Sequence, residues 1–221
     1  MSSITFEEIR NNLEIKKYIE LADESLAAMG YTEHSFKHIG LVAQRVEYIL
    51  DSLGYSKNDI ELGKIAAYMH DIGNLVNREG HCQSGALMAF MLLHRLGASS
   101  DDIAIITAAI GNHDEATGYP VNYITAALML ADKADVRRTR VRNNDVSTFD
   151  IHDRVNYSVV SSRLDIDENR TSITLSLEID TKYSSVMEYF EIFLDRMLLC
   201  KKAAQILDLD FRLIMNDQSV L

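Results

Sequence analysis

The sequence predicts a mainly α-helical protein of the α+β class, in which a helical bundle precedes a small antiparallel β element and a long C-terminal helix. Two observations support this prediction. Up to about residue 150, apolar residues recur at helical spacing in segments that end at glycines or polar caps. Over residues 171–179 the pattern changes to strict alternation, which is typical of a strand. We therefore divide the chain into a helical part, 1–150, and a hairpin-plus-helix appendage, 151–221, packed on it.

The helices of the first part are predicted from their end signals. Thr5 and Glu8 form a capping-box pattern at the start of the first helix, and Pro120, the only proline, precedes the last. The appendage should contain a hairpin, a helix, and a strand that pairs with the hairpin. The expected helices cover approximately 5–29, 33–53, 58–70, 82–96, 99–113, 121–136 and 183–207, and the expected strands 157–166, 171–179 and 210–216.

Composition and charge restrict the possible partners. The net charge of −11 opposes generic nucleic-acid binding, although a local pocket can still hold a small anion. No apolar run approaches the roughly 18 residues of a membrane span, and the first ten residues do not resemble a signal peptide. Cys82 and Cys200 have no metal-binding or redox spacing. We expect a reduced, cytoplasmic protein that does not contact membranes.

Histidines and aspartates gather at the ends of the predicted helices. Any one of them, taken alone, is more often a surface residue or a hydrogen-bonded core residue. Together they offer imidazole nitrogens and carboxylate oxygens, the usual ligands of divalent transition metals, which a helical bundle can bring together. The pattern therefore predicts a metal site. Its candidate ligands are His34, His38, His70, Asp71, His81, His113 and Asp132.

The order of these residues resembles the HD-domain metal-dependent phosphohydrolase superfamily. His38 is followed by Val42 and Ala43 and stands 32 positions before His70 (70 − 38 = 32), as is common for the first histidine of that family. Residues 70–73 read "HDIG", the family's His-Asp motif. The resemblance covers about residues 30–142.

The resemblance implies a phosphohydrolase that cleaves a nucleotide or another small phosphorylated metabolite with a metal-activated water. It implies two divalent ions, of Mn, Fe, Mg, Ni, Co or Zn. Asp71 would bridge them, and Asp114 would orient an imidazole. One shell would comprise His38, His70 and Asp132, the other His81 and His113, with His34 as a candidate additional ligand.

An arginine-rich strip follows the helix that carries Asp132. Arg137, Arg138, Arg140 and Arg142 lie within eleven residues of an acidic chain, at 135–145. They could be cations at a solvated helix end, or they could hold phosphate through their forked donors. The family often has lysine where this chain has Asn74, so we expect Arg137 or Arg138 to supply the missing charge.

Two alternatives remain open on the sequence. A regulatory module would bind metal and nucleotide without catalysis, and a di-iron oxygenase would use the same ligands for oxygen chemistry. Asn112 and the early position of "GYP", 118–120, argue against cyclic-dinucleotide hydrolysis. The long helix at 183–207 is apolar enough to form a homo-oligomer interface.

Overall fold

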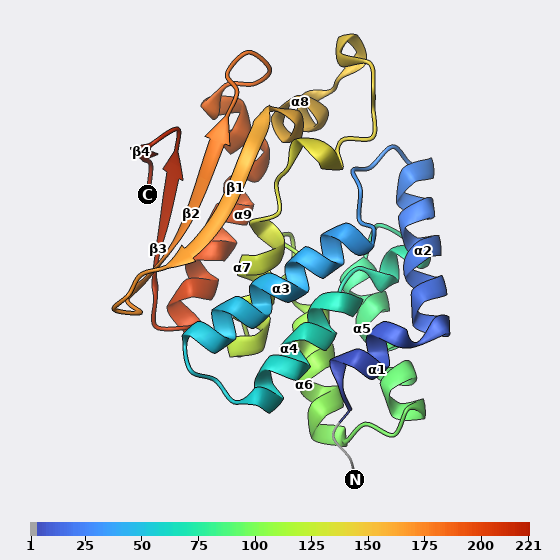
Figure 1. Ribbon diagram of the computed structural model, residues 1–221. Coiled ribbons are helices and arrows are strands. Elements are labelled where there is room, and N and C mark those ends of the chain that lie inside the picture. Colours follow the sequence, from blue (N-terminus) through green and yellow to red (C-terminus); the bar gives the residue numbers. More distant parts are fainter. Residues whose placement is uncertain (1–3) are drawn as a thin grey trace.

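A computed structural model describes residues 4–221 and confirms the predicted fold class (Figure 1). A helical bundle is followed by a four-stranded sheet with a long helix on one of its faces. The α-helices among residues 4–221 are α1 (Phe6–Asn11), α2 (Leu13–Ala28), α3 (Phe36–Ser52), α4 (Lys57–Met69), α5 (His81–Arg95), α6 (Ser100–Gly111), α7 (Tyr123–Lys133), α8 (Ile151–Ser158) and α9 (Val186–Ile206). The strands are β1 (Val159–Ile166), β2 (Ser172–Ile179), β3 (Asp210–Met215) and β4 (Gln218–Ser219), and three short 3-10 turns are η1 (Ile72–Leu75), η2 (Arg138–Arg140) and η3 (Val146–Thr148).

The predicted helix over 5–29 is two helices. Asn12 has an extended backbone, with φ −69° and ψ 118°, which ends α1. Its side chain accepts hydrogen bonds from the amides of Glu14 and Ile15 and thereby caps α2. The sequence pattern missed this break because the apolar spacing continues across it.

Other helix boundaries also differ from those predicted. Ser35 caps α3, so His34 precedes the helix and does not share a helical face with His38. The helix expected to reach 136 ends at Lys133. Helix α8 was not predicted, because its eight residues are too few for a clear helical period.

The sheet is mixed rather than wholly antiparallel. Strands β1 and β2 form the predicted antiparallel hairpin, in which Leu164 lies opposite Leu175. Strand β3 joins β2 in parallel, with Phe211 opposite Ile173. The cause is α9, whose 21 residues span about 31 Å and carry the chain back along the sheet before β3 begins.

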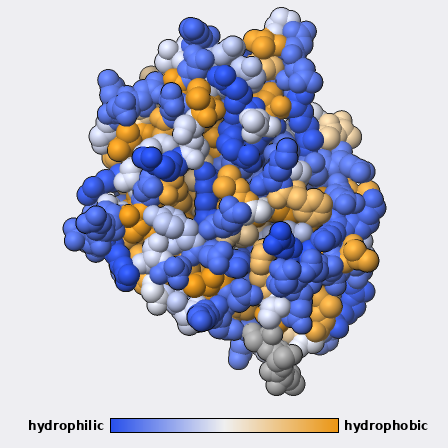
Figure 2. Space-filling view, viewed as in Figure 1, coloured by the Kyte–Doolittle hydropathy of each residue, from blue (hydrophilic) through white to orange (hydrophobic). Residues whose placement is uncertain are grey.

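The appendage packs on the bundle through α9, which lies between the sheet and α7 (Figure 1). The alternating residues Ile173, Leu175 and Leu177 are buried on β2, and α9 buries Tyr189 and Met197. The face shown in Figure 2 is mostly hydrophilic, with dispersed hydrophobic patches. Within residues 4–221, none of the helices has both the length and the apolar character needed to cross a bilayer.

Candidate metal centre

The first group of candidate ligands joins α3, α4 and α7. The Nε2 atom of His38 lies 3.3 Å from Asp132 Oδ1 and 3.6 Å from Asp71 Oδ2. The Nε2 atom of His70 lies 3.1 Å from Asp71 Oδ2 and 3.7 Å from Asp132 Oδ1. Ligands about 2.0–2.2 Å from one ion lie about 2.8–3.6 Å apart at octahedral or tetrahedral angles. These four donors therefore have nearly the spacing of a single coordination shell.

A second group forms around the other oxygen of Asp71. Asp71 Oδ1 lies 3.7 Å from His81 Nε2 and 3.8 Å from His113 Nε2. The two imidazole nitrogens are 3.2 Å apart. Oδ2 of Asp71 therefore faces the first group and Oδ1 faces the second. Asn74 supports this orientation by donating a hydrogen bond to Asp71 Oδ1 at 3.0 Å.

The other ring nitrogen of each of these histidines faces an oxygen. His70 Nδ1 lies 2.7 Å from the carbonyl oxygen of Ala67, and His38 Nδ1 lies 2.7 Å from Asp135 Oδ2. Such contacts fix the tautomer, so that Nδ1 carries the proton and Nε2 is free to ligate. The corresponding partners are the carbonyl oxygens of Arg78 for His81 and of Ile110 for His113.

Gly73 allows the two groups to approach each other. It lies in η1, which packs against the N-terminal end of α5. A Cβ atom at Gly73 would lie 2.0 Å from the carbonyl oxygen of His81 and 2.4 Å from the amide nitrogen of Gly85. The glycine of the "HDIG" motif is therefore required for the close contact that brings His81 to Asp71.

The electrostatics favour positive charge between the carboxylates. Burial would lower the pKa of His70, but the charges of Asp71 and Asp132 raise it to about 10. Burial would raise the pKa of Asp71, but His70 holds it well below its usual range. Burial lowers the pKa of His113 to about 3, and the positive charge of His70 adds to this effect. His113 is thus kept neutral, as a ligand must be, while the carboxylates attract a cation.

The donor set fits divalent metal ions. The Nε2 atoms of His38 and His70 lie 3.3 Å apart. The Nε2 atoms of His81 and His113 face each other in the same way. A cation between the members of each pair could be ligated by both Nε2 atoms, with Nδ1 carrying the only ring proton. Mixed imidazole and carboxylate donors suit Zn, Fe, Mn, Co or Ni.

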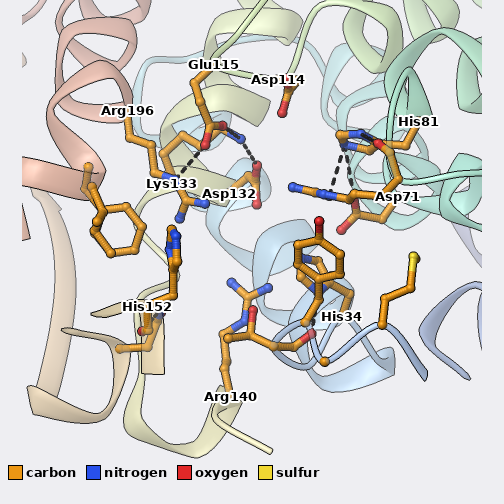
Figure 3. A pocket seen from close by; sticks show the side chains of 18 of the residues that line it. His34, Asp71, His81, Asp114, Glu115, Asp132, Lys133, Arg140, His152 and Arg196 are labelled. Atoms are coloured by element: carbon orange, nitrogen blue, oxygen red, sulfur yellow. Dashed lines mark hydrogen bonds and ion pairs between the residues drawn. The ribbon is translucent and has the colours of Figure 1, made fainter. Parts of the chain in front are cut away.

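The centre opens into a cavity of about 360 Å³. We call its two sides the ligand wall, formed by Asp71, His81, His113 and Asp132, and the outer wall, formed by Asp150, His152, Asp153, Phe193 and Arg196. Helices α8 and α9 supply the outer wall, so the appendage completes the cavity. Figure 3 shows Arg140 and His152 extending into the cavity from the side opposite Glu115 and Asp114.

A chain of buried and half-buried charges connects the walls. Lys133 Nζ lies 2.9 Å from Asp132 Oδ2 and 2.6 Å from Glu115 Oε2, as Figure 3 shows. Glu115 also accepts a hydrogen bond from Arg196 Nε at 2.8 Å. Burial would lower the pKa of Lys133, but Asp132 and Glu115 raise it, so Lys133 stays charged. This chain holds Asp132 with Oδ1 directed at His38 and His70.

Two candidate residues lie beside the donor groups rather than within them. His34 lines the cavity, and its ring centroid is 5.4 Å from that of His38. Its Nδ1 lies 2.7 Å from the carbonyl oxygen of Thr32. Asp114 also lines the cavity. Neither belongs to the compact donor groups among the described residues, whose ligand atoms all lie within 4.8 Å of one another.

The predicted phosphate-binding arginines do not line the cavity. Arg137 forms a two-pronged ion pair with Asp135, and Arg138 stacks over Tyr157 while it donates to that residue's carbonyl oxygen. The short η2 turn instead directs Arg140 inwards. The choice among these arginines depends on the turn's geometry, which no sequence period reveals.

Several functional candidates were missed or undervalued by the sequence analysis. Arg140 is only 5% exposed, and its hydrogen bonds, to the carbonyl oxygens of Glu33 and Asp135, use Nε and Nη1. Asp135 orients His38, which its position three residues after Asp132 could have suggested. Lys133, which adjoins Asp132, was not among the predicted site residues. No local pattern indicated Arg196.

The fold and the site together define a helical protein with a buried cluster of histidines and aspartates that could hold metal ions. The sequence pattern of the HD domain family matches residues 35–151, more than half of the chain. The chain therefore belongs to the HD domain family, which confirms the predicted resemblance.

Among solved structures, the chain is similar to a predicted HD superfamily hydrolase from an uncultured Thermotogales bacterium. The two are 21% identical over 59% of this chain and 73% of that chain, with a TM-score of 0.43. None of the curated proteins matches the chain.

Proposed function

We propose that the protein is a binuclear metal-dependent phosphohydrolase that cleaves a small phosphate ester, such as a nucleotide or a phosphorylated metabolite. The observation that carries this proposal is the placement of Asp71, whose two oxygens face two separate histidine groups. Membership of the HD domain family agrees with it.

The residues divide into ligands and substrate-binding groups. His38, His70 and Asp132 would hold one ion, His81 and His113 the other, and Asp71 both. When bound, such ions activate water near neutral pH and offset negative charge on a phosphoryl group. Lys133 fixes Asp132 through their 2.9 Å ion pair, which keeps the other aspartate oxygen directed at the first ion's position.

Arg140 is the best group to hold the phosphate. Its Nη2 takes no part in the hydrogen bonds that fix the side chain, and Figure 3 shows the guanidinium directed into the cavity. A second cation, Arg78, lines the cavity beside His81, with 3.5 Å between its Nη1 and His81 Nε2. Arg78 also donates to Asn74 at 3.4 Å, so it can supply positive charge close to the position where the family often has lysine. These two arginines replace Arg137 and Arg138 in the proposal.

A substrate screen tests the proposal. The purified protein, loaded with Mn²⁺, should release phosphate from at least one nucleotide or phosphosugar, and Asp71→Asn should not. Cyclic dinucleotides serve as a further substrate class. Full metal occupancy without turnover of any phosphate ester would overturn the catalytic proposal in favour of a regulatory module. Bound iron with oxygen consumption would favour the oxygenase.

A further inference from the structure

The outer face of α9 carries a row of exposed residues at regular spacing. Its positions are separated alternately by four and three residues, which places them on one side of the helix. Met187 is 76% exposed, Leu194 49% and Leu198 47%, although all three are apolar. We call this row the α9 seam: Met187, Glu191, Leu194, Leu198, Lys201 and Gln205, all exposed.

The seam lies on the side of α9 that faces away from the catalytic cavity. Phe193 and Arg196, which line the cavity, are roughly on the opposite side of the helix. Tyr189 and Met197 are buried in the core. Among residues 4–221, the side chains of Glu191 and Lys201 form no ion pair and no hydrogen bond with each other or with any other residue.

The seam is complementary to itself in one orientation. When a second α9 packs antiparallel, about a two-fold axis at position 196, Leu194 meets Leu198 and Glu191 meets Lys201. Each pair is equally far from position 196, so every contact occurs twice. Parallel packing would instead place Glu191 against Glu191. Asp195 and Lys202 beside the seam follow the same division, acidic towards the N-terminus of the helix and basic towards its C-terminus.

We propose that the α9 seam is a self-association surface, whose partner is the antiparallel α9 of a second copy of this chain. The two leucines form its apolar centre, and the Glu191–Lys201 pairs on either side set its direction. Helix α5 also exposes apolar residues, including Leu87 at 67%, but its exposed row of Leu87, Phe90 and Met91 carries no opposed charges. Because the α9 row carries complementary charges and the α5 row does not, we place the self-association surface on α9.

Sedimentation of the full chain tests the proposal across about a hundredfold range of concentration, since dimerisation is concentration-dependent. The wild type should form dimers. Glu191→Lys should raise the dissociation constant at least about tenfold, because two pairs change from attraction to repulsion. Lys201→Glu should act alike, and the double variant E191K/K201E should recover wild-type association, since it restores both pairs.

Two further variants distinguish specific dimerisation through this surface from nonspecific hydrophobic association. Leu198→Glu should give monomers, whereas Leu87→Glu on α5 should leave dimerisation unchanged. Circular dichroism and the thermal midpoint should show that each variant keeps its fold. A wild type that stays monomeric over the whole range would overturn the proposal. A dimer that Glu191→Lys does not weaken, or that the double variant does not restore, would overturn it as well.

Discussion

The ligand wall and the outer wall of the cavity hold their side chains in different ways. On the ligand wall, His81 and His113 are buried, and each is fixed through Nδ1 by a backbone carbonyl oxygen. On the outer wall, Asp150 and His152 are exposed. Within the described residues, the side chain of His152 has no hydrogen bond and no ion pair.

This difference suggests that the two walls have different functions. Fixed imidazoles and carboxylates have the spacing that a metal shell needs, and small displacements would weaken binding. Exposed side chains on α8 can adapt to the part of a substrate that does not react. We therefore expect ligand-wall variants to lose metal and all turnover, and outer-wall variants to alter substrate preference.

The largest effect is expected from Asp71→Ala. Removing the oxygen donors to both groups should abolish the retention of both ions and reduce kcat/KM by more than about 1,000-fold, equivalent to about 4 kcal/mol. Metal analysis and phosphate release measure the two effects. Asp114→Asn is the matched control within the same cavity and should keep both ions. Full metal occupancy in Asp71→Ala would contradict the bridging assignment.

His81→Ala should separate the two ion sites. The wild type should bind close to two ions per chain, and the variant close to one, because the first donor group stays complete. Elemental analysis after desalting gives the ratio. His152→Ala, an outer-wall histidine, should retain two ions. One ion per chain in the wild type would place the protein among mononuclear members of the family.

Arg140→Ala should weaken transition-state binding without loss of metal. Loss of a charge-assisted hydrogen bond costs about 1.5–3 kcal/mol, which corresponds to roughly 10- to 150-fold in kcat/KM. Arg138→Ala is the control, since that side chain binds Tyr157 and Asp180 outside the cavity. Equal activities in the two variants, with folding confirmed by circular dichroism, would remove Arg140 from the substrate site.

Glu115→Gln should mainly affect stability. Glu115 connects the ligand wall to α9 through Lys133 and Arg196, and its side chain is 22% exposed. Because Lys133 and Arg196 would then lose a charged partner, we expect the free energy of unfolding to fall by about 1–3 kcal/mol. Urea denaturation provides the measurement. Glu24→Gln, at an exposed site on α2, should be neutral, and a neutral Glu115→Gln would show that the walls are not linked through this residue.

The smallest effect is expected from His152→Ala. Metal content and kcat should stay near wild type, while KM should change by less than about tenfold and to different extents for different phosphate esters. Steady-state kinetics with two unlike substrates would reveal this. A uniform loss of kcat would instead place His152 in the reaction itself.

The sequence predicted the ligand wall better than the outer wall for physical reasons. His70 and Asp71 lie at a helix end with a motif that restricts them locally, and each further ligand follows in a fixed order. The outer wall depends on how α8 and α9 dock, and docking leaves no period in the sequence. The arginine strip shows the same limit. The sequence shows the concentration of arginines at 135–145, but the geometry of the η2 turn determines that Arg140 lines the cavity. Likewise, a third strand was predicted over 210–216, whereas its parallel pairing followed from the path of α9.

The parallel pairing of β2 with β3 also influences the order in which the molecule can fold. The paired residues are separated by 38 positions (210 − 172 = 38), and α9 occupies more than half of that interval. Closing such a loop costs conformational entropy before the strands form the contacts that offset this cost. Helices α3 and α4, which follow each other in the chain and pack together, can form early. Pulse-labelling hydrogen exchange during refolding should therefore protect the amides of α4 before those of β3, and an enclosed cavity should appear only with the later phase.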